Sequence, residues 1–348
     1  MAELTRALAG LRADDGRAFG GKSSALGELI AAGIPVPPGF AVSTAAYQAF
    51  VSEAGLEPMI ASAISGLDPG DVDQVGAVAH RIGEAMRSAR IPPSVRDQVA
   101  EDYAGLGEPS VAVRSSALGE DSREATFAGQ QETYLWVRGT EEVCDAVRDC
   151  WVSLYSPPAI TYRARLGAAA GEPAMGVVVQ QMVDAEVSGV MFTCNPVSGD
   201  QSMVAINASW GLGLAVVGGE VTPDDFLVSK VTGEVVREHV HVKEVEYVPD
   251  ERGRGTVRRE VPEERREVAC LDADSLEALV EVGRRVERHF GSAQDVEWAI
   301  ARGGELPSSL YVLQSRPVTT GQKRTEKPKP TSAMSLLMST FGAGDADK

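Results

Sequence analysis

The amino-acid sequence predicts an α+β or α/β protein built in several lobes. Two observations predict this class. The chain has 348 residues, of which 43% are hydrophobic and 24% charged, the balance of a soluble globular protein with a sizeable core. At about 100–200 residues per domain, this length suggests two or three lobes. In addition, segments with the apolar spacing of helices are interspersed with segments that have the spacing of strands.

Helical patterns dominate the first third of the chain. Residues 22–32 carry apolar side chains at helical spacing and are followed by a glycine and a proline-rich turn, which predicts where this helix ends. A short strand over 39–42 leads to Ser43, a residue suited to cap a helix that runs to about residue 54. Two further amphipathic helices are expected over 71–89 and 93–104.

The middle of the chain is richer in strands. Runs of β-branched and other apolar residues are bounded there by glycine and polar residues, which is typical of short buried strands. One helix is expected among them, near residues 141–155. The strands are expected over 110–114, 132–137, 175–183, 188–193 and 203–208.

The last part of the chain begins with a dense run of both charges over 251–267, which indicates a solvated hairpin or loop. Residues 274–290 have the pattern of an amphipathic helix. Two closing strands are expected over 295–300 and 310–315. Residues 321–348 change to a polar, Gly- and Asp-containing composition that we interpret as a mobile tail or linker remnant.

The charge balance excludes several classes of function. Asp and Glu total 50 and Lys and Arg total 33, so the formal net charge is −17. Such an acidic chain is unsuited to bind nucleic acid or an anionic membrane generally. No apolar run approaches the roughly 20 residues of a membrane helix. The cysteines are Cys144, Cys150, Cys194 and Cys270, and no two of them form a C-x-x-C pair. A zinc knuckle or a disulfide framework is therefore not indicated, and we expect a cytoplasmic protein.

A glycine-rich segment near the N-terminus is the first candidate for chemistry. Gly16, Gly21, Lys22 and Ser23 fit the spacing of a phosphate-binding P-loop. A P-loop needs a buried strand directly before it, whereas residues 11–15 are mostly charged, so that fold is disfavoured. What remains is a flexible glycine pair that presents Lys22 at the start of a helix, where an anion binds favourably. The alternative is a solvated lysine on an amphipathic helix.

The second candidate is Arg114, which ends a predicted strand and is followed by Ser115 and Ser116. A guanidinium can bind phosphate through two parallel hydrogen bonds, which an ammonium cannot. Residues 119–131 are polar and contain glycine, the composition of a loop that closes over a ligand. The alternative is an ordinary surface loop beside a structural Arg–Asp pair.

The closing strands hold the third candidate. Side chains alternate along a strand, so Asp295 and Glu297 share one face, and Gln314 and Arg316 share a face of the next strand. Antiparallel pairing would bring these groups together, with acid and amide oxygens suited to Mg²⁺ and a guanidinium suited to phosphate. The alternative is a solvated sheet face with a cross-strand Arg–acid pair.

Together, these segments resemble the N-terminal ATP-binding region shared by phosphoenolpyruvate synthase, pyruvate phosphate dikinase and rifampicin phosphotransferase. The matching motifs follow the family's order over roughly residues 15–320. They are F-G-G-K at 19–22, G-I-P-V-P-P-G-F at 33–40, V-R-S-S-A at 113–117, F-A-G-Q at 127–130, Q-Q-M-V at 180–183, S-G-V-M-F-T at 188–193, G-L-G at 211–213, D-V-E-W at 295–298 and L-Q-S-R-P at 313–317.

The resemblance implies an α+β, ATP-grasp-type fold whose lobes surround a central cleft and enclose Mg-ATP. The expected lobes are 1–108 with 175–245, then 109–174, then 246–320. By motif, Lys22, Arg114 and Arg316 would hold phosphates and serve catalysis. Glu297 and Gln314 would bind Mg²⁺, with Asp295 beside them. Gln180, Met182 and Val183 would contact the adenine. The 119–131 loop, including Thr126 and Gly129, would cover the triphosphate.

The activity implied by the resemblance is transfer of the β-phosphoryl group of ATP to a histidine on a separate swivelling domain, with release of AMP. This chain carries no segment like the family's histidine domain, so we expect a partner chain to supply it, as in phenylphosphate synthase, with a phenolic compound or pyruvate as final acceptor. One departure is Leu214, where the family has glutamate after Gly-Leu-Gly. That departure leaves an alternative, a nucleotide-binding regulatory subunit without turnover.

Overall fold

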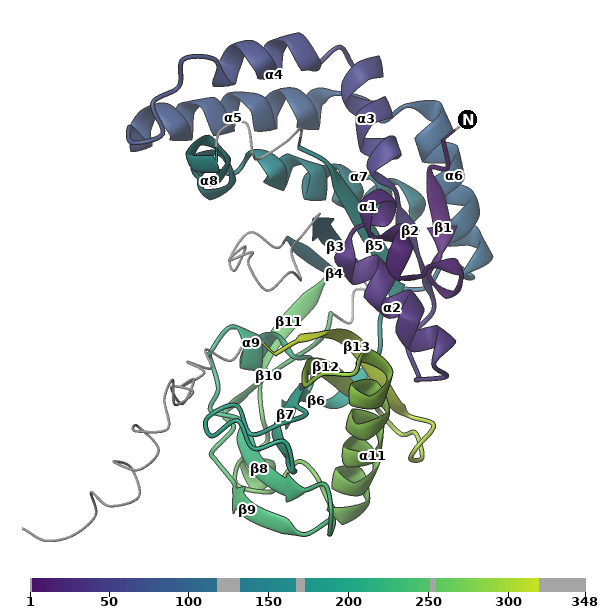
Figure 1. Ribbon diagram of the computed structural model, residues 1–348, viewed down its shortest axis with the longest axis vertical. Coiled ribbons are helices and arrows are strands. Elements are labelled where there is room, and N and C mark those ends of the chain that lie inside the picture. The colour runs from purple at the N-terminus through teal and green to yellow at the C-terminus, as the bar shows by residue number, and fades with distance from the viewer. Residues whose placement is uncertain (1, 118–131, 167–172, 251–254, 319–348) are drawn as a thin grey trace, which may run out of the picture. The chain divides into compact units, whose positions relative to one another are not determined.

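The computed structural model describes residues 2–117, 132–166, 173–250 and 255–318 of the chain. Two antiparallel sheets with helices packed on them make up most of the described residues, beside a small two-stranded sheet (Figure 1). The antiparallel sheets and the helices packed on them confirm the predicted α+β class. Among the described helices, none is both long enough and apolar enough to cross a membrane.

The first large sheet has five strands in the order β1-β2-β5-β3-β4. Its central strand β5 is buried on both faces, which explains its almost continuous apolar sequence. Val177 and Val179 pack into the core of the helical layer, and Val178 packs with Leu26 and Leu29 of α2. The strands are β1 (Thr5–Ala7), β2 (Gly39–Val42), β3 (Val111–Ala117), β4 (Thr133–Val137) and β5 (Met175–Gln181).

Helices from the first half of the chain form the layer on this sheet (Figure 1). Its core includes Trp151, which is fully buried and stacks on Phe50 with ring centroids 5.3 Å apart. The helices of this half are α1 (Gly16–Phe19), α2 (Gly21–Ala31), α3 (Thr44–Glu53), α4 (Glu57–Ile64), α5 (Val72–Ser88), α6 (Pro93–Gly105), α7 (Thr140–Val152) and α8 (Pro157–Leu166).

The second large sheet has six strands in the order β13-β12-β6-β7-β8-β9. Helix α11 (Ala273–Phe290) packs on it through a buried apolar stripe. Asp272 caps its start by accepting from the Ser275 amide, and Gly291 ends it at φ 68°. The strands are β6 (Ala185–Phe192), β7 (Met203–Trp210), β8 (Asp224–Ser229), β9 (Val235–His239), β12 (Gln294–Ala301) and β13 (Leu310–Pro317).

The charge-rich segment supplies the second strand of a hairpin, whose first strand precedes the segment and is largely buried. Strand β10 (Val245–Pro249) pairs antiparallel with β11 (Thr256–Glu260), whose side chains are mostly exposed. Short helices α9 (Leu214–Val217) and α10 (Glu263–Arg266) complete the described elements. Residues 321–348, the expected tail, lie outside the described residues.

Each of the two large sheets joins strands from separate parts of the chain. Strand β3 pairs with β5 over its whole length, so residues 109–174 share a sheet with strands from 1–108 and 175–181. Strand β12 pairs with β6, so 185–239 and 294–317 also share one sheet. The physical reason is that antiparallel ladders join strands that are far apart in sequence, which the chain order alone does not reveal.

Candidate functional site

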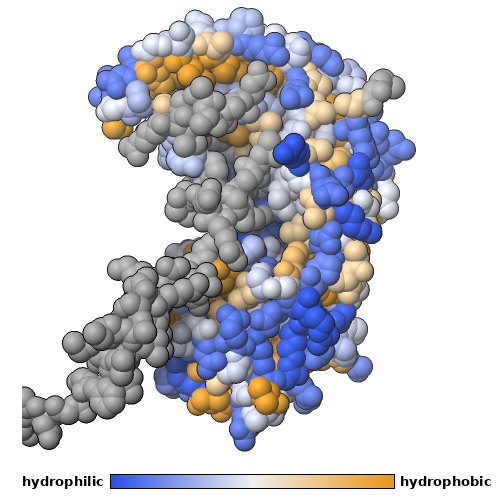
Figure 2. Space-filling view, viewed as in Figure 1, coloured by the Kyte–Doolittle hydropathy of each residue, from blue (hydrophilic) through white to orange (hydrophobic). Residues whose placement is uncertain are grey.

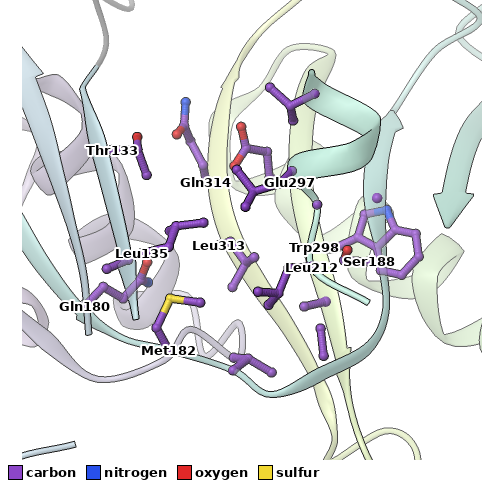
Figure 3. A pocket seen from close by; sticks show the side chains of 18 of the residues that line it. Thr133, Leu135, Gln180, Met182, Ser188, Leu212, Glu297, Trp298, Leu313 and Gln314 are labelled. Atoms are coloured by element: carbon purple, nitrogen blue, oxygen red, sulfur yellow. The ribbon is translucent and has the colours of Figure 1, made fainter. Parts of the chain in front are cut away.

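A cavity of about 300 Å³ is lined by residues of both large sheets and of α9. Figure 3 shows Glu297 and Gln314 next to one another, with their polar ends pointing the same way. Gln180 and Met182 lie at the other end of the cavity, and Leu212 and Leu313 lie between (Figure 3). The cavity therefore has a charged and polar end and a largely apolar end.

Arg114 comes from β3 and lines this cavity. Its side chain is only 13% exposed, and its Nη1 donates to the Leu313 carbonyl oxygen at 3.3 Å. The same Nη1 lies 3.9 Å from Oε2 of Glu297. The buried Nε has no acceptor among the described residues. A buried charged donor without a partner is unfavourable, so a ligand oxygen or a water at this position would stabilise it.

Glu297 and Gln314 face each other as register partners on β12 and β13, and both line the cavity. The next pair along the ladder is Asp295 with Arg316, whose Nε donates to Oδ2 of Asp295 at 2.8 Å. Burial raises the pKa of Asp295, and Arg316 opposes this by stabilising the carboxylate. Asp295 and Arg316 are not among the residues that line the cavity.

Lys22 lies in the first turn of α2, and its side chain is buried. Its Nζ donates to the carbonyl oxygen of Ser115 at 2.9 Å, one residue along β3 from Arg114. Gly20 makes this approach possible, because its φ is +86° and a Cβ there would stand 2.1 Å from the Ser116 carbonyl oxygen. Lys22 does not line the cavity.

The sequence places three residues at the adenine end, and all three line the cavity: Gln180, Met182 and Val183. Gln180 is 1% exposed, and its Nε2 has no acceptor among the described residues. The Met182 amide is engaged, because it donates to the Ser110 carbonyl oxygen at 2.9 Å. The free side-chain donor of Gln180 is therefore the better candidate for recognising a ligand acceptor.

Several cavity residues were not expected from the sequence. Leu135 and Leu313 supply apolar surface, and Ser188 and Leu212 complete the wall. Leu214 also lines the cavity, so the position that departs from the family pattern belongs to the site. Apolar residues that alternate along β4 and β13 were the available signal, but it does not distinguish a cavity wall from an ordinary core. Thr126 and Gly129 lie outside the described residues.

No group of three or more His, Cys, Asp or Glu side chains arranged to hold a metal ion occurs in the described ranges. The donors at the polar end, one carboxylate and one amide, are nevertheless hard oxygen ligands of the kind that Mg²⁺ prefers. They would suit an ion that takes its other ligands from a bound phosphate and water.

Comparison with known proteins identifies the family. A family model described as the pyruvate phosphate dikinase AMP/ATP-binding domain matches residues 17–336. The probable phosphoenolpyruvate synthase of Methanothermobacter thermautotrophicus is 43% identical, over 95% of this chain and 48% of that protein. The probable phosphoenolpyruvate synthase of Methanocaldococcus jannaschii is 41% identical, over 93% of this chain and 28% of that protein.

The phosphoenolpyruvate synthase of Pyrococcus furiosus is 36% identical, over 93% of this chain and 45% of that protein. This chain therefore spans about half the length, or less, of the relatives it matches. Among solved structures, PH1788 from Pyrococcus horikoshii aligns with a TM-score of 0.34 and 13% identity, covering 88% of this chain and 94% of that chain.

Proposed function

This chain belongs to the family of pyruvate phosphate dikinase AMP/ATP-binding domains, and from this premise we propose that it is the ATP-binding part of a dikinase-type phosphotransferase. The cavity would bind Mg-ATP, with the base at the apolar end and the phosphates at the polar end. ATP would be cleaved to AMP as its β-phosphoryl group passes to a histidine and its γ-phosphoryl group passes to water or to inorganic phosphate.

One observation supports this proposal above the others. Arg114, Glu297 and Gln314 come from three separate strands and line the same cavity. Its volume of about 300 Å³ is at the lower end of the range for small-molecule sites. Phosphoryl transfer depends mainly on positioned positive charge, and a buried guanidinium with an unpaired Nε provides it.

Glu297 and Gln314 would hold the Mg²⁺ ion, with Asp295 beside them. The ion would stabilise the negative charge that spreads over the transferred phosphoryl group. The protein's own part is to keep a carboxylate and an amide in register on adjacent strands, so that both oxygens are available on one side of the cavity.

Lys22 and Arg316 complete the proposed phosphate-binding set, although neither lines the cavity. Each lies next to a residue that lines the cavity or contacts the neighbour of such a residue. Lys22 contacts the residue after Arg114, and Arg316 belongs to the ladder pair next to Glu297 and Gln314. Rotation of these long side chains would bring them to the phosphates, and we propose that Thr126 and Gly129 cover the triphosphate.

We further propose that a separate chain carries the phospho-accepting histidine, with a phenolic compound or pyruvate as the final acceptor. The motivation is that the relatives extend well beyond the part that this chain matches. A shuttling histidine also suits the physics, because the described lining side chains include no histidine, cysteine or lysine that could accept the phosphoryl group as a nitrogen or sulfur nucleophile, and the site would work by positioning and electrostatics.

The test is incubation of the chain with Mg-ATP, with and without a histidine-domain partner, while AMP is quantified by chromatography. AMP formation that depends on the partner supports the proposal. Tight ATP binding without turnover under any partner would instead identify a nucleotide-binding regulatory subunit.

The site assignment is tested by Arg316→Gln. A matched control exists on the same sheet, because Arg237 donates through Nε to Asp225 at 2.8 Å, as Arg316 does to Asp295. Arg316→Gln should lower ATP affinity and AMP formation, while Arg237→Gln should leave both unchanged. Equal behaviour of the two variants would refute the role of Arg316.

A further inference from the structure

A second cavity, of about 460 Å³, is formed by the end of α5, the start of α6 and the first half of α7. It shares no lining residue with the candidate ATP site. These three helices belong to the helical layer that covers the five-stranded sheet (Figure 1). Nothing in the proposed phosphotransfer uses this cavity.

Arginine is concentrated around it. The lining includes Arg87, Arg90, Arg96 and Arg148. In a chain with a net charge of −17, four guanidinium groups around one cavity are a local reversal of charge. The lining carboxylates are Asp97, Glu141 and Asp145, so the lining charge is 4 − 3 = +1.

The ion pairs at the rim leave donors for a ligand. Arg96 pairs with Glu141, and Arg148 pairs with Asp145 at 2.8 Å. The side chains of Glu141 and Asp145 are 67% and 59% exposed, and pairs with such exposed partners contribute little to stability. Arg96 also lies 3.7 Å from Asp97, and Arg87 lies near both Glu84 and Asp149. Each guanidinium has five N–H donors, so even two carboxylates need not saturate it.

One of the arginines has a buried donor without an acceptor, and another has no carboxylate partner among the described residues. The Nε of Arg148 is buried and has no acceptor in the described part of the chain. Arg90 is exposed, and no carboxylate of the described residues lies within ion-pair distance of it. A buried charged donor without an acceptor is costly, and a bound oxyanion would remove that cost.

We propose that this cavity binds a small phosphorylated anion. Guanidinium groups recognise phosphate through paired, charge-assisted hydrogen bonds, and four of them suit a doubly charged oxyanion better than a neutral or cationic ligand. The competing explanation is that the pairs only fasten α5 and α6 to α7, through Arg87–Asp149 and Arg96–Glu141.

Isothermal titration calorimetry of the full chain in a phosphate-free, low-salt buffer tests this. One arm uses inorganic phosphate as the ligand, and a second uses a simple alkyl phosphomonoester. Comparison of the two affinities shows whether the cavity prefers free phosphate or a phosphorylated metabolite. Arg90→Gln and Arg148→Gln should each weaken binding roughly tenfold or more, the loss expected for one charge-assisted hydrogen bond. Arg237→Gln, the control, should bind as the wild type does.

Absence of binding in both arms would overturn the proposal. Binding that is unchanged in both variants would also overturn it, because the anion would then occupy another site such as the ATP cavity. Should Arg148→Gln fail to fold, Arg90→Gln decides the question, since Arg90 is exposed and forms no ion pair within the described residues.

Discussion

Replacing the proposed metal ligand Glu297 by glutamine should change ATP binding in opposite directions with and without magnesium. Glu297 lies 3.9 Å from the Arg114 guanidinium, so the two charges compensate each other in the ligand-free protein. A nucleotide phosphate must compete with Glu297 for Arg114, and the metal ion must compete with Arg114 for Glu297. The isosteric Glu297→Gln change removes the carboxylate and leaves Arg114 available to phosphate.

The magnitudes follow from exposure and distance. Glu297 is 35% exposed, so the pair with Arg114 contributes on the order of 1 kcal/mol, which is about fivefold in a binding constant. Metal-free ATP should therefore bind the variant up to about fivefold more tightly. Loss of an ionised ligand should weaken Mg-ATP binding by roughly tenfold or more. The enhancement of ATP affinity by magnesium should thus fall by about fiftyfold.

Titration calorimetry with ATP in excess EDTA and in excess MgCl₂ measures this ratio directly. Glu186→Gln is the matched control, because Glu186 is also a half-exposed residue of the second sheet and pairs with Arg265 at 3.5 Å. The control should keep the wild-type ratio. A Glu297→Gln protein with an unchanged magnesium enhancement would refute the assignment of Glu297 as a metal ligand.

Three further predictions concern the candidate site, the approach of α2 to β3 and a buried thiol of the helical layer. Arg114→Gln should weaken ATP binding about tenfold or more by calorimetry, while Arg237→Gln should not. Gly20→Ala should lower the free energy of unfolding in urea by about 2 kcal/mol or more, because the new Cβ would stand 2.1 Å from a carbonyl oxygen of β3. In the control Gly66→Ala, φ is also positive but no atom lies within 4 Å of the new Cβ, so the free energy of unfolding should fall by less. Burial raises the pKa of Cys144 from 9.0 to about 11, so the unfolded chain loses this proton first and stability should fall between pH 9 and 11, by about 1 kcal/mol at pH 10. Cys144→Ala should reduce that pH dependence in urea melts by this amount, because burial also raises the pKa of the Cys150 and Cys270 thiols and their contribution remains.

Elements with a strong local pattern could be predicted from the sequence. The helix over Ala273–Phe290 has a regular apolar stripe, a capping aspartate and a terminal glycine, so its limits were expected to within one residue at the start. A strand near His239 and His241 is expected from the alternating valines, but the limits of β9 could not be predicted, because all of its residues are exposed and no alternation of burial marks it. Its existence depends on pairing with β8, which is a tertiary effect.

The polar end of the candidate site could be anticipated from the local sequence pattern of two strands. The alternation of side chains along a strand places Glu297 opposite Gln314 once β12 and β13 pair, and this pairing follows from their short connection. The contact of Lys22 with the Ser115 carbonyl could not be anticipated, because it depends on how closely α2 approaches β3 at Gly20. Apolar members such as Leu135 have no distinguishing sequence signal.

The structure adds a relation among the charges that residue types alone do not contain. Arg114 lies near Glu297, and Arg316 donates to Asp295, so each proposed phosphate-binding arginine in this cluster is matched with a proposed metal-binding acid. Removing one partner would leave a poorly solvated charge, most severely at the largely buried Asp295, so each charge is neutralised by its partner in the structure. When nucleotide and metal ion bind together, the phosphates can neutralise the arginines and the metal ion can neutralise the acids. Either ligand alone leaves the arginines or the acids without a compensating charge. A site of this kind should therefore bind the nucleotide and the cation with positive coupling, and that coupling should weaken when either acid is made neutral.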